Sequence, residues 1–189
     1  MSRSHLLIVL ILFLMFSPCM AAAEQEAGWS KPSNGLQAKL AFSKTDGTAG
    51  TPVITAYLEL RNVSDLGSVM EVPLKLDAIK YELHDETGKV VPPTGGSFDG
   101  ASVPLGMLRL PYDSSLRFNI SSHGAGIESN QAGLLELGPS SVWTFPSGDK
   151  HSYSLTAKIT IEKHRHLSDN VIWSGIIEIP ATLLPSLTK

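Results

Sequence analysis

The fold class is decided by the stretch YSLTAKITI, residues 153–161. Every odd-numbered position in it carries an apolar side chain, and every even-numbered position carries Ser, Thr or Lys. Successive side chains of a β-strand point to opposite faces, so this alternation gathers the apolar groups on one face. The stretch predicts a strand with one face in a protein core and the other in water.

The same period of two recurs along the chain after residue 23. The expected strands are residues 36–42, 54–61, 79–84, 116–120, 142–145, 153–161 and 171–179. No stretch of comparable length after residue 23 sustains a helical repeat. Seven or eight short strands in a chain of this size predict an all-β fold, in outline an antiparallel immunoglobulin-like β-sandwich.

Turn-forming residues separate the expected strands. Residues 44–50 and 85–89 are rich in Gly, Asp and Thr. In the second of these segments, Gly88 can take the positive φ that closes a short hairpin loop. Residues 164–170 are expected to form the loop of the last hairpin, ahead of the strand at residues 171–179.

The N-terminal segment, residues 1–23, has the organisation of a secretory signal peptide. Arg3 precedes an unbroken apolar run at residues 6–16, and small residues follow up to Ala23. The run has 11 residues, whereas a helix needs about 20 to span a bilayer, so an uncleaved anchor is disfavoured. We expect cleavage after Ala23, with a cut one or two residues earlier as the alternative.

Cys19 leaves one alternative open, because bacterial lipoproteins are cleaved just before a cysteine that then carries lipid. Here Pro18 precedes the cysteine, and its fixed φ and missing N–H fit poorly in an extended peptidase substrate. The favoured interpretation is a cysteine in a discarded peptide. The expected location is then secreted or periplasmic, with lipid anchoring at Cys19 as the alternative.

Composition limits what residues 24–189 can do. Removal of Arg3 leaves 14 basic residues against 18 acidic ones, spread without long runs of either sign. This balance does not favour binding to nucleic acid or to an anionic membrane surface. The single cysteine lies in the signal segment, so we expect one domain without disulfides, thiol nucleophile or thiolate metal site.

Two patches resemble known bacterial domains. WSKPSNGLQAKL, residues 29–40, is similar to the start of a group of uncharacterised bacterial secreted domains, although Ser30 stands where that group usually has Gly. LELGPSSVW, residues 135–143, followed by an alternating strand, resembles bacterial immunoglobulin-like modules that include the BsuPI-type proteinase inhibitors. Neither patch carries chemistry, so the resemblance implies the fold and export and no particular activity.

Glu162, His164 and His166 form the one cluster with metal-ligand character. On a strand that continues past residue 161, their alternation would place all three on one face, where imidazole and carboxylate suit zinc or copper. The interleaved Lys163 and Arg165 favour the other interpretation, the solvated end of a hairpin. We therefore assign no metal, no cofactor and no catalytic residue, and keep these three as metal candidates.

Residues 91–106 contain three prolines and four glycines, which predicts a long loop. Loops of this length are often functional, and Phe98 with Asp99 near its middle could contact a partner. Residues 121–131 form a second polar, Gly-rich segment. Both segments are candidate binding surfaces.

The three tryptophans, Trp29, Trp143 and Trp173, could be platforms for ligand stacking. In a β-sandwich without disulfides, however, large aromatic side chains more often fill the core or cover its rim. We expect core or rim positions, with Trp29 the most exposed of the three.

Taken together, these features predict an exported, non-enzymatic interaction or accessory module of the cell envelope. The first alternative is an extracellular proteinase inhibitor that presents residues 91–106 to a protease cleft. The second is a metal-binding envelope protein. An unrecognised hydrolase is the weakest alternative, because no nucleophile motif is present.

Overall fold

The computed structural model of the chain describes residues 25–26, 28–46, 52–65, 67–95, 104–121, 131–137, 141–146, 148–163 and 171–186. Their regular elements are β-strands and one short 3₁₀ turn, so the all-β class is confirmed. The expected signal segment, including Cys19, lies outside these residues. No helix in the described part of the chain is both long enough and apolar enough to span a membrane.

The strands pair antiparallel, apart from one short parallel pair between β12 and β4. In chain order the elements are β1 (Gln25–Glu26), β2 (Leu36–Asp46), β3 (Pro52–Asn62), β4 (Met70–Lys75), η2 (Leu76–Ala78), β5 (Ile79–His84), β6 (Val90–Val91), β7 (Pro104–Leu110), β8 (Ser115–Asn119), β9 (Gln131–Glu136), β10 (Val142–Pro146), β11 (Ser154–Ile161), β12 (Val171–Ile172) and β13 (Gly175–Leu183).

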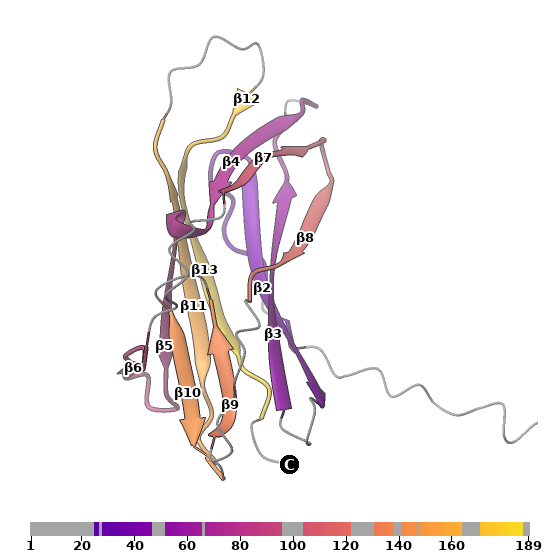
Figure 1. Cartoon of the computed structure of the whole chain (residues 1–189). Coiled ribbons are helices and arrows are strands. Elements are labelled where there is room, and N and C mark those ends of the chain that lie inside the picture. Colours follow the sequence, from indigo (N-terminus) through magenta and orange to yellow (C-terminus); the bar gives the residue numbers. More distant parts are fainter. Residues whose placement is uncertain are drawn as a thin grey trace, which may run out of the picture.

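Two layers face each other in Figure 1. One contains the sheet β1-β2-β3-β8, and the other contains the sheet β13-β11-β5-β6 together with the hairpin β9-β10. A third sheet, β12-β4-β7, lies at the top of the molecule in this view. Each layer therefore combines strands from separate parts of the chain.

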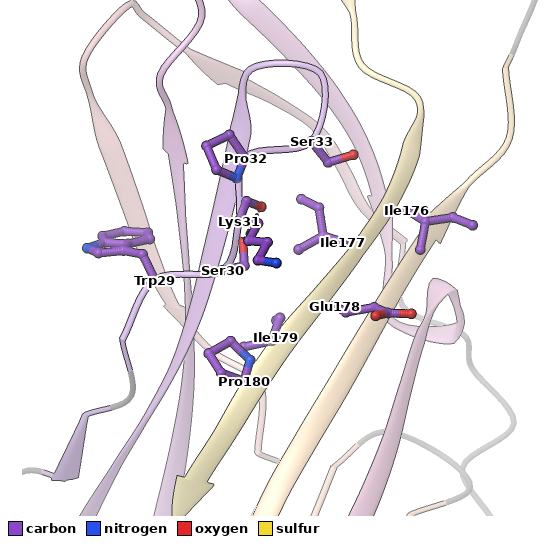
Figure 2. Close-up of a pocket in the computed structure, with 10 residues that line it drawn as sticks. All are labelled: Trp29, Ser30, Lys31, Pro32, Ser33, Ile176, Ile177, Glu178, Ile179 and Pro180. Atoms are coloured by element: carbon purple, nitrogen blue, oxygen red, sulfur yellow. Dashed lines mark hydrogen bonds between the residues drawn. The ribbon is translucent and has the colours of Figure 1, made fainter.

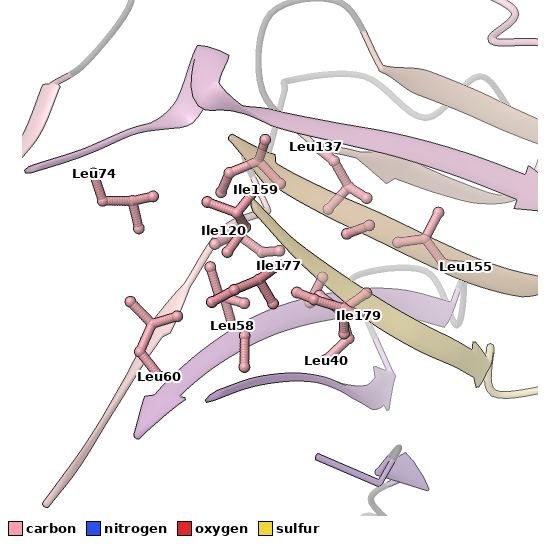
Figure 3. Close-up of a cluster of buried hydrophobic side chains, with 14 of the residues drawn as sticks. Leu40, Leu58, Leu60, Leu74, Ile120, Leu137, Leu155, Ile159, Ile177 and Ile179 are labelled. Carbon is pink, nitrogen blue, oxygen red and sulfur yellow. The ribbon is translucent and has the colours of Figure 1, made fainter. Parts of the chain in front are cut away.

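The core lies between the layers. On β11 the side chains of Leu155, Ala157, Ile159 and Ile161 are buried, as their alternation predicts. Figure 3 shows the side chains of the two layers meeting there. Its labelled residues are Leu40, Leu58, Leu60, Leu74, Ile120, Leu137, Leu155, Ile159, Ile177 and Ile179.

One buried amide joins the β3-β8 pair to the β4-β7 pair. Asn62 is 0% exposed, and its Nδ2 donates to the carbonyl oxygens of Ser68 at 3.1 Å and Leu110 at 2.9 Å. Its Oδ1 accepts from the N–H of Ser64 at 3.0 Å. Because a buried amide is costly unless its bonds are made, Asn62 fixes how β3 leads into β4.

The predicted turn at residues 85–89 is confirmed, and residues 111–115 form a second turn. Gly88 has a φ of 81°, and the Asp85 carboxylate accepts from the N–H groups of Thr87 and Lys89 at 2.9 and 3.0 Å. In the second turn, Ser114 Oγ donates to the carbonyl of Pro111 at 2.6 Å. Both turns use a short polar side chain to bind local backbone, as sequence chemistry indicates.

The expected single strand at residues 171–179 is wrong. Val171 and Ile172 pair parallel with β4, whereas the chain from Gly175 onward pairs antiparallel with β11. Between the two strands, the N–H of Trp173 donates to the carbonyl of Glu71 at 2.8 Å. β11 therefore pairs with the chain after Gly175 and not with Val171, because Trp173 is bound to the third sheet.

The expected loop at residues 91–106 is too long at both ends, because Val91 ends β6. Pro104 begins β7, which pairs with β4. Residues 96–103, which include Phe98 and Asp99, lie outside the described part of the chain. The expected set lacks β4, β7 and β9, and also the two-residue strands β1 and β6.

Candidate functional site

The edges of the two layers approach each other along β13. β13 is the last strand of its sheet, and residues 28–33 run beside β2 in the opposite layer. The Ser30 N–H donates to the Ala38 carbonyl at 2.8 Å, and Ser30 Oγ accepts from the Ala38 N–H at 3.0 Å. Ser30, the departure from the resembled bacterial motif, therefore pins this segment to β2.

A tight turn returns the segment into β2. Ser33 and Leu36 exchange backbone bonds of 2.9 and 3.0 Å, and Asn34 and Gly35 between them have φ values of 47° and 80°. Two consecutive positive φ angles define a two-residue hairpin loop, and Asn-Gly is its preferred sequence. A Cβ at position 35 would lie 2.7 Å from Cβ of Ser64, so a side chain there would also clash.

Side chains tie the two edges together at both ends. At one end Asn34 Nδ2 donates to the Ser174 carbonyl at 2.8 Å, and Trp173 Nε1 donates to the Ser33 carbonyl at 2.8 Å. At the other end Lys44 Nζ donates to the Ser186 carbonyl at 2.6 Å. Among the described strands, β13 pairs only with β11, so no ladder crosses the region between these ties.

A groove of about 590 Å³ occupies that region. We call this groove, lined by residues 29–33 and 176–180, the open seam. Figure 2 shows its walls, residues 29–33 on one side and residues 176–180 of β13 on the other. The walls are largely apolar, with Pro32, Ile176 and Pro180 exposed to solvent. Ile176 is 51% exposed, one of the more exposed large apolar side chains among the described residues.

The charges at the open seam are not balanced. Glu178 pairs with Lys158 on β11 at 3.1 Å. Lys31 on the opposite wall is exposed and has no ion pair with any described residue. The largely apolar walls of the seam therefore carry one ammonium group without an ion pair to a described residue and one carboxylate that is paired with Lys158.

Trp29 stands at the outer margin of the seam and is half-buried. Nζ of Lys39 lies 4.9 Å from the centre of its ring, and the same Nζ lies 3.1 Å from the Glu59 carboxylate. Trp143 and Trp173 are 1% and 2% exposed. The core and rim positions expected for the three tryptophans are confirmed, with Trp29 the most exposed.

A second group of polar residues lies between β10 and β11. Asp149 Oδ1 accepts from the His151 N–H at 3.0 Å and lies 2.7 Å from His151 Nδ1, while Asp149 Oδ2 accepts from the Tyr153 hydroxyl at 2.8 Å. The Asp149 side chain is only 3% exposed. His151 Nε2 remains at the surface, 3.8 Å from Glu86 Oε1 in the β5-β6 turn.

These contacts change the acidities of the three groups. Burial raises the pKa of Tyr153 to about 12, and its bond to Asp149 adds to this. Burial also acts to raise the pKa of Asp149, but the bonds from His151 and Tyr153 outweigh it, so the pKa lies below its usual value. The bond to Asp149, followed by the charge of Glu86, raises the pKa of His151.

The hydrogen bonds that Asp149 accepts from His151 and Tyr153 stabilise the turn between β10 and β11. Asp149 orients the His151 ring as an acid orients a histidine base. The described contacts of His151 are with carboxylates and the Tyr153 ring, not with a hydroxyl or thiol nucleophile. In the sequence, Asp149, His151 and Tyr153 stand at every second position, but nothing there indicates that the Asp149 carboxylate is buried and binds the other two residues.

The metal candidates are only partly described. Glu162 is exposed directly after β11, and His164 and His166 lie outside the described residues. Within the part of the chain that the structure describes, no three His, Cys, Asp or Glu side chains come together as metal ligands. The metal site therefore stays a prediction, as does the partner loop with Phe98 and Asp99.

No protein-family model, curated protein or solved structure matched this chain when it was compared with them. The resemblances at residues 29–40 and 135–143 therefore stay predictions. The described residues of this stretch include the end of β9 and the start of β10, where Leu135 pairs with Trp143. Function has to be inferred from the geometry of the chain itself.

Proposed function

We propose that residues 24–189 form an exported, non-enzymatic interaction module of immunoglobulin-like β-sandwich fold. Its partner is a protein of the cell envelope or of the extracellular space, and the binding surface is the open seam. The two facing layers of antiparallel strands in Figure 1 support the fold assignment. The signal-peptide pattern of residues 1–23 supports export.

The open seam is the observation that carries this proposal. An unpaired sheet edge offers main-chain donors and acceptors to another chain, and it is normally covered or blunted. Here the edge of β13 faces a groove of about 590 Å³ with apolar walls. Exposed apolar surface next to an unpaired edge favours protein binding over a purely structural role.

The polar group at Asp149 supports a non-enzymatic role. Both carboxylate oxygens of Asp149 accept hydrogen bonds from the turn that they stabilise. With its pKa near 12, the Tyr153 phenol stays protonated at neutral pH and acts as a donor to Asp149. These residues act as a structural anchor between β10 and β11.

Photo-crosslinking tests the binding function. Benzoylphenylalanine is introduced at position 31, 176 or 90, and the protein is irradiated in envelope extract or culture medium of the source organism. We expect a discrete adduct from positions 31 and 176 and none from position 90, because Val90 is as exposed as Ile176, at 51%, but lies on β6. Absence of an adduct at all three positions would reject the interaction module.

Export is tested on the precursor in a secretion-competent bacterial host. Intact mass and N-terminal sequencing should give a chain that begins at Glu24, directly before β1. Cys19→Ala should leave that product unchanged. A lipidated chain that begins at Cys19, or retention of residues 1–23, would contradict the assignment.

A further inference from the structure

We infer that the open seam binds an extended, acidic segment of its partner, which adds as a strand to the free edge of β13. This inference rests on the proposed binding function and specifies its ligand. It follows from the main chain of β13, from the side chains beside it and from the charge of Lys31.

The main chain sets the length of the added strand. β13 begins at Gly175, and Pro180 within it has no N–H to donate. Beyond Pro180 the pairing with β11 is irregular, and the N–H of Leu184 already donates to the Tyr153 carbonyl at 2.8 Å. The usable edge is residues 175–179, which matches a strand of about five residues, roughly 17 Å long.

The side chains set the pattern of the added strand. In Figure 2, Lys31 and Ile176 lie on either side of the β13 ribbon. Neighbouring residues of an added strand would point alternately toward these two sides. An apolar side chain would extend the exposed surface of Ile176, and the residues on either side of it would face Lys31 and the N-terminal wall.

Charge selects an acidic residue for the position that faces Lys31. Glu178 is neutralised by Lys158 at 3.1 Å, whereas Lys31 has no ion pair with a described residue. A carboxylate of the partner would therefore meet a cation that has no ion pair with a described residue, because the one carboxylate in the groove walls, Glu178, is paired with Lys158. A basic residue at the same position would be repelled.

Pro180 and Glu178 also limit unselective pairing of the β13 edge with strands of other chains. Proline and charged side chains on an edge strand are common barriers to edge-to-edge aggregation. They shorten the usable edge without closing it. A short partner strand of matching charge is then favoured over long, unselective pairing.

The probe is the five-residue peptide acetyl-Thr-Val-Glu-Val-Thr-amide, titrated into residues 24–189 and followed by NMR of the backbone amides. The first control peptide carries Lys in place of Glu. Two others carry N-methyl groups on alternate amides, on the odd or the even positions. Because a strand directs alternate N–H groups to each side, only one N-methylated isomer should lose binding.

We expect shifts at residues 175–179 and binding about fivefold tighter for the Glu peptide than for the Lys peptide. Lys31→Glu should reverse that preference. Ile176→Glu should abolish binding, whereas Val90→Glu, at a site of equal exposure, should leave it unchanged. Equal binding of both N-methylated isomers, or shifts confined to another surface, would overturn strand addition.

The remaining outcomes separate this inference from the proposed function. Crosslinks at position 176 together with no peptide binding would reject strand addition and retain the interaction module, whose partner would then present a folded surface. Absence of the crosslinks and of peptide binding would reject both the interaction module and strand addition. Concentration-dependent self-association in the ultracentrifuge that Ile176→Glu abolishes would show a second copy in the seam and overturn the partner segment.

Discussion

The two sides of the molecule close in different ways. At the side opposite the open seam, the β9-β10 hairpin of the second layer is bridged to Ser121, which follows β8 of the first layer, and to Gly95, which follows β6. At the open seam, the ties that the structure shows between residues 33–44 and residues 173–186 are side-chain bonds to carbonyl groups. We call the first the closed side.

The two buried tryptophans make the comparison direct. On the closed side, Trp143 Nε1 donates to the Val91 carbonyl at 2.9 Å; at the seam, Trp173 Nε1 donates to the Ser33 carbonyl at 2.8 Å. Trp143 lies within a paired strand, whereas Trp173 lies in the break between β12 and β13. Each indole joins two segments, but only Trp143 is supported by a ladder.

The difference separates stability from binding. Where backbone pairs with backbone, no donors or acceptors remain for another chain. Where side chains hold the edges at their ends, the main chain between them stays available. The closed side should therefore dominate the free energy of unfolding, and the seam should control local opening and ligand access.

Removal of the Trp143 ring should have the largest effect. Trp143→Ala deletes a side chain that is 1% exposed and should lower the free energy of unfolding by about 3–5 kcal/mol. Urea unfolding followed by circular dichroism measures this. Trp143→Phe is the matched control and should cost about 1–3 kcal/mol, because it keeps a ring but removes the hydrogen bond to the Val91 carbonyl. A loss below 1 kcal/mol for Trp143→Ala would remove the distinction between the two sides.

Trp173→Phe should have a smaller and more local effect. Loss of the bond to the Ser33 carbonyl should cost about 1–3 kcal/mol and loosen the N-terminal wall of the seam. Hydrogen exchange should become faster at the Ser30 and Ser33 amides while the amides of β10 keep their protection. Faster exchange in β10 as well would mean that the two sides open as one unit.

Asn34→Asp should have a still smaller effect. The substitution keeps a residue that tolerates positive φ but removes the Nδ2 donor to the Ser174 carbonyl. Because Asn34 is exposed, we expect a loss of about 0.5–1.5 kcal/mol. Asn34→Gly removes the same bond and serves as the control. Full stability of both variants in urea would show that this tie contributes nothing.

The smallest effect should be a pH dependence of the Asp149 anchor. Since the pKa of His151 is raised, its stabilisation is complete below about pH 6.5 and is lost as the pH rises through the folded-state pKa. Since the pKa of Asp149 is lowered, its stabilisation is complete above about pH 3.9 and is lost as the pH falls through its folded-state pKa.

Stability from this anchor should therefore be greatest between about pH 4 and pH 6.5. Thermal unfolding across that range measures it. His151→Gln should remove the decline on the alkaline side. Asp149→Asn should remove the decline on the acidic side and also reduce the alkaline one, because the bond to Asp149 is the largest cause of the raised pKa of His151. Glu86 and Asp85 also act on His151, so Glu86→Gln should reduce the alkaline decline only in part. An unchanged profile in His151→Gln would assign the decline to other groups.

Strands with one wet face were predictable from sequence. β2, β3, β5 and β11 each lie within or around an alternating stretch. β4, β7 and β9 escaped prediction because each contains a residue of low strand propensity, Pro73, Gly106 or Gly133. Proline and glycine in a strand lower its propensity, and the pairing with neighbours supplies what the local sequence lacks.

The candidate site was less predictable. The sequence drew attention to long loops and to the alternation at Glu162, His164 and His166. The seam instead combines residues 29–33 with residues 176–180, which are almost the full length of the chain apart. No local sequence pattern predicts that these two segments, which are distant in the chain, will face each other without pairing.

The sequence alone determined that this chain is all-β, where its most regular strands lie, which of their side chains fill the core and where Gly88 closes a tight turn. Those properties follow from the two-residue period of a strand and from the φ preferences of Gly, Asn and Asp, which act within a few residues. Tertiary structure alone decided that Trp173 separates β12 from β13, that the β9-β10 hairpin closes one side and that the edge of β13 stays open. Pairing between strands depends on which surfaces meet after the core has formed, and that information is spread over the whole chain.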